Sequence, residues 1–76
     1  MKITHDKRAN AIYIHLTDGK FHHNQVINDD VILDIDADGA VIGIELLGVS
    51  DWVSEPDEFK FQDITPHIPA STAKNK

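Results

Sequence analysis

The side chains best suited to bind an ion lie in one acidic stretch near the middle of the chain. They match the calcium-loop pattern D-x-D/N-x-D/N-G-x₅-E and are Asp34, Asp36, Asp38, Gly39 and Glu45. Calcium takes hard oxygen ligands of this kind, and the glycine permits the sharp bend that such a loop needs. The chemistry that this set indicates is binding of a divalent cation, Ca²⁺ or Mg²⁺.

The same stretch also fits a β-hairpin that needs no ion. Asp38-Gly39 between two apolar runs is typical of a two-residue type I′ turn, in which both central residues need positive φ. The apolar pairs that this register places on one face are Ala37–Ala40, Ile35–Ile42, Leu33–Ile44 and Val31–Leu46. A calcium loop lies between two helices, whereas these flanks are rich in β-branched residues and turn formers. We therefore predict a hairpin, and cation binding through Asp34, Asp36, Asp38 and Glu45 remains the alternative.

The elements that position this hairpin are further short strands with alternating apolar residues. Such segments cover residues 2–6, 11–16 and, in a more polar form expected at a sheet edge, 21–27. Folding the first strand back on the second places Ile3 and His5 on the face of Ile12 and Ile14, with Tyr13 on the other face. The sequence thus predicts a mainly β protein, a small antiparallel meander of three to five strands.

The C-terminal third has less regular patterning. Residues 49–53 suggest one helical turn with Ser50 as its N-cap, which would be the only helix. We expect one domain over residues 1–53, with an arm and a disordered tail over 54–76. The second face of the sheet mixes apolar and acidic residues, and we expect it to be covered, in the same chain or in a partner, by Trp52, Phe59 and Phe61.

Composition limits the function classes. The chain has 76 residues, no cysteine and a formal net charge of −6. A chain this short has a small core, and without disulfides we expect self-association into a homodimer or higher oligomer. The acidic charge argues against a nucleic-acid partner, and no apolar run is long enough to span a membrane. Residues 1–6 lack an apolar signal core, so we expect a cytoplasmic protein.

No residue set indicates catalysis. The five histidines lack zinc-site spacing; His5 and His15 fall on opposite faces, and His22-His23 reads as a solvated pair with at most adventitious metal binding. Asp34 and Glu45 share a face, but no nucleophile, oxyanion hole or phosphate loop accompanies them. A metal-assisted hydrolase would need the histidines to converge on these carboxylates. We predict no enzyme, no catalytic residues and no cofactor.

The chain resembles a family of short bacterial proteins, domain of unknown function 2283, over about residues 1 to 50. The segments that carry the resemblance are Met1–Asp6, Ile12-Tyr13-Ile14, Asp34–Gly39 and Ile42–Leu47. His5 stands where the family usually has tyrosine, and the segment from Trp52 onward is longer than usual. The resemblance implies a small β-rich fold without assigned activity, and, because some members look like neighbours of small toxin-like proteins, an antitoxin-like role.

These observations together predict a small non-catalytic protein-interaction module. Its acidic sheet face or an edge strand would engage a protein partner, and a basic toxin-like protein fits the net charge of −6. The alternative, from another class, is a divalent-cation-binding protein that uses the acidic turn.

Overall fold

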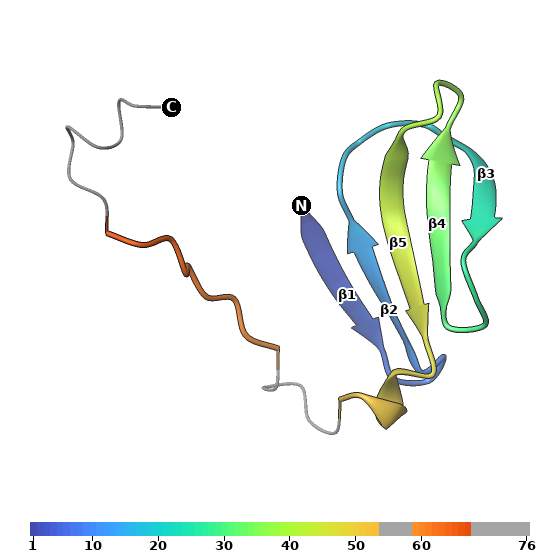
Figure 1. The fold of residues 1–76 in the computed structure, drawn as a ribbon. Helices are drawn as coiled ribbons and strands as arrows, with labels where there is room; N and C mark the ends of the chain where they lie inside the picture. The colour runs from blue at the N-terminus through green and yellow to red at the C-terminus, as the bar shows by residue number, and fades with distance from the viewer. Residues whose placement is uncertain (54–58, 68–76) are drawn as a thin grey trace.

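The structure is a computed structural model that describes residues 1–53 and 59–67. It contains one sheet of five strands, followed by a single 3₁₀ turn (Figure 1). The elements are β1 (Lys2–Asp6), β2 (Ala11–His15), β3 (Phe21–Val26), β4 (Val31–Asp36), β5 (Val41–Leu47) and η1 (Val49–Asp51). The mainly β, antiparallel prediction is confirmed, and no helix within the described ranges is long and apolar enough to cross a membrane.

The strand order differs from the simple meander that the sequence suggested. The order is β1-β2-β5-β4-β3, with every neighbouring pair antiparallel. The chain forms a first hairpin, crosses one end of the sheet after β2, and returns so that β5 lies between β2 and β4 (Figure 1). The polar strand β3 lies at an edge, as predicted. The acidic hairpin therefore lies beside β2 instead of at the end of a linear series.

Alternation along the strands gives the sheet two chemically different faces. In the apolar face, His5 opposes Ile12, Ile14 opposes Ile44, and Leu33 also opposes Ile44 from the other side. The members of this face are Ile3, His5, Ile12, Ile14, Val31, Leu33, Ile35, Ile42, Ile44 and Leu46, with His23 and Gln25 of β3 at its edge. The opposite, polar face carries the carboxylates of the strands, which are Asp6, Asp34, Asp36 and Glu45.

The central hairpin is confirmed, but its turn is longer than predicted. Ala37 to Gly39 form a three-residue loop in which only Gly39 has positive φ, and the amide of Asp36 donates to the carbonyl of Ala40. Asp36 Oδ1 also accepts hydrogen bonds from the amides of Asp38 and Ala40, both at 2.9 Å. This side chain stabilises the wider turn, so the type I′ prediction and the Ala37–Ala40 pair are wrong.

A β-bulge in β5 then restores the predicted register. Ile35 opposes Val41, so the expected Ile35–Ile42 pair is wrong, and the register shifts by one residue between Asp34 and Ile35. Beyond the shift, the predicted pairs Leu33–Ile44 and Val31–Leu46 are present. Ile42, the extra residue, is buried at the end of the apolar face, where Gly19 of the crossing loop lies against its side chain.

The other end of the sheet is closed by η1. Gly48, with φ of 63°, precedes this turn as its N-cap, and no side chain caps it, so the prediction of Ser50 as N-cap is wrong. Ser50 contacts Asn10 instead: its amide donates to Asn10 Oδ1 at 2.9 Å, and Asn10 Nδ2 donates to its hydroxyl at 3.0 Å. Asn10 has a φ of 53°, in the left-handed region. This contact fixes η1, and with it the buried Val49, against the β1–β2 turn.

The aromatic residues after the sheet do not cover its polar face within this chain. The ring of Phe59 lies 5.7 Å from that of His5, which belongs to the apolar face. Phe61 is fully exposed, and Trp52 is half exposed. Residues 59–67 run away from the sheet on the β1 side (Figure 1). The prediction that the aromatic residues cover the polar face in the same chain is therefore wrong. Of the arm and tail expected over 54–76, residues 54–58 and 68–76 lie outside the described residues.

Candidate functional site

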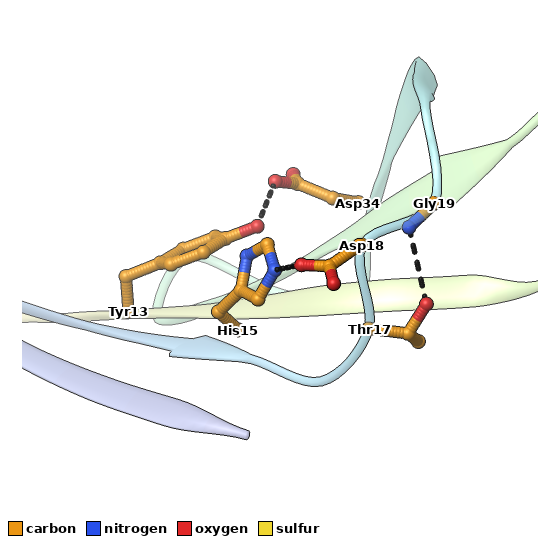
Figure 2. A network of polar contacts seen from close by, with 6 residues as sticks. All are labelled: Tyr13, His15, Thr17, Asp18, Gly19 and Asp34. Carbon is orange, nitrogen blue, oxygen red and sulfur yellow. Dashed lines mark hydrogen bonds and ion pairs between the residues drawn. The ribbon is translucent and has the colours of Figure 1, made fainter.

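The centre of the polar face holds a hydrogen bond that crosses three strands. The Tyr13 hydroxyl, on β2, donates to Asp34 Oδ2, on β4, at 2.9 Å (Figure 2). The strand between them is β5, where Gly43 opposes both His15 and Asp34. The phenol therefore lies across the backbone of β5 to reach the carboxylate.

Gly43 makes this crossing possible. A Cβ atom at this position would lie 2.0 Å from the Tyr13 hydroxyl oxygen and 2.6 Å from Cζ, far inside van der Waals contact. The requirement is for space and not for an unusual backbone conformation, since Gly43 has no positive φ. Tyr13 and Gly43 thus form a matched pair, in which the missing side chain of one leaves room for the ring of the other.

Asn24 and Glu45 complete the cluster. Asn24 Nδ2, on the edge strand β3, donates to Asp34 Oδ1 at 2.7 Å and lies 3.4 Å from Glu45 Oε2. A hydrogen bond with Asp34, partial burial and the Asp34 charge raise the pKa of Glu45 above its ordinary value of 4.5. Burial, the hydrogen bond to Asp34 and the charges of both carboxylates raise the pKa of Tyr13. We call Tyr13, Asn24, Asp34 and Glu45 the carboxyl cluster.

A second polar contact lies beside the carboxyl cluster. His15 Nε2 is 3.2 Å from Asp18 Oδ1, and the His15 ring lies 6.2 Å from that of Tyr13 (Figure 2). Thr17 Oγ1 accepts a hydrogen bond from the Gly19 amide at 3.1 Å and shapes the crossing loop. The Asp18 side chain is fully exposed, so the pair with His15 is a surface contact of small energetic weight.

The four carboxylates of the calcium-loop pattern do not gather in the structure. Asp34 and Glu45 meet in the carboxyl cluster, as their shared face predicts, whereas Asp36 Oδ1 holds the turn amides and Asp38 lies at the exposed tip. In residues 1–53 and 59–67, no group of three or more His, Cys, Asp or Glu side chains is placed to hold a metal ion. Strands flank this loop on both sides, so it is not the calcium loop between two helices (an EF-hand) whose sequence pattern it matches.

Four of the five histidines are spread over the sheet, and His67 lies in the segment 59–67 that follows it. His5 and His15 lie on opposite faces, as predicted, and His5 packs against Phe59. A register shift in β3 brings the rings of His22 and His23 to one side, with their Nδ1 atoms 2.8 Å apart, and both residues are exposed. They lie on the edge strand itself and not in a loop.

Comparison with known proteins places these residues in a family. The family model described as "Protein of unknown function (DUF2283)" matches residues 2–50. The chain belongs to this family. The match covers β1 to β5 and therefore includes Tyr13, Asp34, Gly43 and Glu45, which carry the sequence resemblance and meet on the polar face of this DUF2283 sheet. The search of curated proteins found no match, and the search of solved structures found none either.

The sequence places three of the four cluster residues on one face. Alternation placed Asp34 and Glu45 on one face and pointed Tyr13 away from the apolar face. It missed Asn24, because β3 carries no strong pattern, and it missed the role of Gly43, because the β2–β5 pairing joins segments far apart in the sequence. A glycine on the polar face beside an outward tyrosine was the available signal.

The cluster offers proton sharing, and two hollows lie beside Tyr13. One of about 130 Å³ lies on the β1 side of Tyr13 and Glu45, and a more open one of about 470 Å³ is lined by Thr4, Tyr13, His15 and Asp18. The second has the volume of a typical ligand pocket, ~300–1,000 Å³, but neither Asp34 nor Glu45 lines it. Each Asp34 oxygen already accepts a hydrogen bond, from Tyr13 and from Asn24. The arrangement fits a role in holding β2, β4 and β3 together over β5.

The raised pKa of Glu45 predicts a pH-dependent stability. The folded chain binds the Glu45 proton more tightly than the unfolded chain does. This contribution is therefore fully present below the ordinary pKa of 4.5 and is lost as the pH rises through the folded pKa. We expect Glu45→Gln to remove this decline in urea unfolding measured from about pH 4 to pH 7. Asp18→Asn, which removes one exposed charge, is the control and should keep the decline. Parallel curves for the wild type and Glu45→Gln would contradict the prediction.

Proposed function

We propose that this DUF2283 protein is a small protein-interaction module without a catalytic role, which buries the apolar face of its sheet against another protein chain. The observation that carries the proposal is that the described strands form a single sheet with no second layer of described residues over this face. Ile14, Leu33 and Ile44 at its centre are half-buried, whereas Ile12, Ile35 and Ile42 nearer its ends are buried. An apolar sheet face is stable when another layer covers it.

The negative charge of the polar face favours a basic partner. The strand carboxylates lie on this face, and the net charge of the chain is −6, so a positively charged protein surface would be attracted to it. An antitoxin-like role toward a small basic toxin is the partner class that we favour, with the cytoplasm as its location. Cation binding has less support, because Asp34 and Asp36 are engaged by protein donors. A calorimetric titration with Ca²⁺ or Mg²⁺ tests it.

The uncovered face can be tested without knowing the partner, because the chain has no cysteine and any introduced thiol is unique. We expect Leu33→Cys to react with a maleimide at least about fivefold more slowly in a lysate of the native cell than in the purified chain at nanomolar concentration, since association buries the apolar face. The matched control is Val26→Cys, exposed on the polar side of β3, which should react equally in both samples. Equal rates for Leu33→Cys in both samples would contradict the proposal.

A further inference from the structure

We propose that the apolar face is covered by a second copy of this chain, and that the segment 59–67 of each copy, here called the arm, packs on the other. This inference rests on the proposed function and names the chain that buries the face. It assigns a use to two features that residues 1–53 and 59–67 leave without a packing partner: the half-buried centre of the apolar face and the arm.

The acidic charge of the strands lies on one side of the sheet, away from the apolar face. Two chains with a net charge of −6 repel each other at most orientations. On the apolar face, however, the strands carry no carboxylate within the described residues, because Asp6, Asp34, Asp36 and Glu45 all belong to the opposite face. Two copies that meet through this face keep their acidic groups on the outside. A two-fold arrangement of two such sheets is a sandwich, in which each face supplies the layer that the other lacks.

The arm begins at the edge of the apolar face and then leaves its own sheet. Its only aromatic contact within the described residues is that of Phe59 with His5, at the β1 edge of the apolar face. Beyond that contact the arm runs away from its own sheet (Figure 1), which leaves Phe61 fully exposed and Ile64 82% exposed. An arm anchored at the edge of the face and directed outward is placed to pack on a copy docked there.

The arm is as long as the sheet is wide. Nine extended residues span about 30 Å, whereas five strands spaced at about 4.8 Å make a sheet about 24 Å wide. The arm is therefore long enough to cross the sheet of a second copy. A face of about 24 by 20 Å contributes roughly 500 Å², and the apolar side chains of the arm extend this toward the ~800 Å² per partner of a stable complex.

The test is the association of the full chain and of two point variants by sedimentation equilibrium. We expect a dimer at about 10 µM and a dissociation constant at least about tenfold higher for Phe61→Ser, which cannot unfold the monomer because the ring is fully exposed. Val26→Ser, an exposed apolar residue on the polar face, is the control and should leave the constant unchanged. In a mixture of labelled and unlabelled chains, we also expect intermolecular NOEs between the Phe61 ring and methyl groups of the apolar face.

Two outcomes would overturn the inference. One is a monomer up to about 200 µM, and the other is a dimer that Phe61→Ser does not weaken. Protection of Leu33→Cys in the lysate, together with a monomeric purified chain, would leave the proposed function in place and assign the face to a different protein.

Discussion

Gly43→Ala is expected to lower the free energy of unfolding by about 3 kcal/mol, although alanine in a strand is ordinarily the more stable of the two residues. The added Cβ would lie 2.0 Å from the Tyr13 hydroxyl oxygen, so the ring must leave its place over β5. Its hydrogen bond to Asp34 is then lost, and that contact joins β2 to β4. Urea unfolding followed by circular dichroism measures the effect.

A double-mutant cycle identifies the cause. In a Tyr13→Val background the ring is absent, and we expect Gly43→Ala to cost less than about 0.5 kcal/mol. Gly39→Ala is the control, because nothing lies within 4 Å of its Cβ position and its φ of 87° makes it costly for another reason. Its cost should be the same with and without Tyr13. An equal cost of Gly43→Ala in both backgrounds would rule out the steric explanation.

Asn10→Ala is expected to lower the free energy of unfolding by about 2–3 kcal/mol for two separable reasons. The variant loses both side-chain hydrogen bonds to Ser50, and it places alanine at a φ of 53°. Asn10→Gly loses the same hydrogen bonds but tolerates this backbone conformation, so its cost should be about 1 kcal/mol smaller. Ser50→Ala removes only the bond to the hydroxyl and should cost least.

Thermal and urea unfolding of these three variants give the ranking. Equal losses of unfolding free energy for Asn10→Ala and Asn10→Gly would mean that the left-handed backbone conformation at residue 10 adds nothing to the cost of Asn10→Ala. A loss within error of zero for both would mean that the Asn10–Ser50 contact does not hold η1 against the sheet.

The sequence predicts the local pairs of this sheet better than the distant ones. Leu33 and Ile44 pair as expected because any slip of one residue would turn Asp34 and Glu45 into the apolar face. The turn between them was harder to predict, since Asp-Gly suits both a two-residue turn and a three-residue loop ending in a left-handed glycine. The Asp36 side chain decides between the two by accepting the amides of Asp38 and Ala40.

The carboxyl cluster depends on contacts that alternation alone does not give. Tyr13 meets Asp34 only because β5 lies between their strands, and strand order is a property of the whole chain. The same holds for Asn24, which reaches Asp34 from an edge strand with little apolar pattern. Ser50 was predicted as an N-cap because serine is favoured there, whereas its actual partner, Asn10, lies 40 residues earlier in the chain.

The order of the strands has a consequence for how the chain folds. The β1–β2 hairpin and the β3–β4–β5 series each join neighbours in the sequence, while the β2–β5 seam joins these two units and closes a chain loop that contains β3 and β4. Closing that loop costs chain entropy before any contact offsets it, so the two units can nucleate independently and their docking is the slow, cooperative step. The Tyr13 ring spans this seam, and its place over Gly43 exists only once docking is complete.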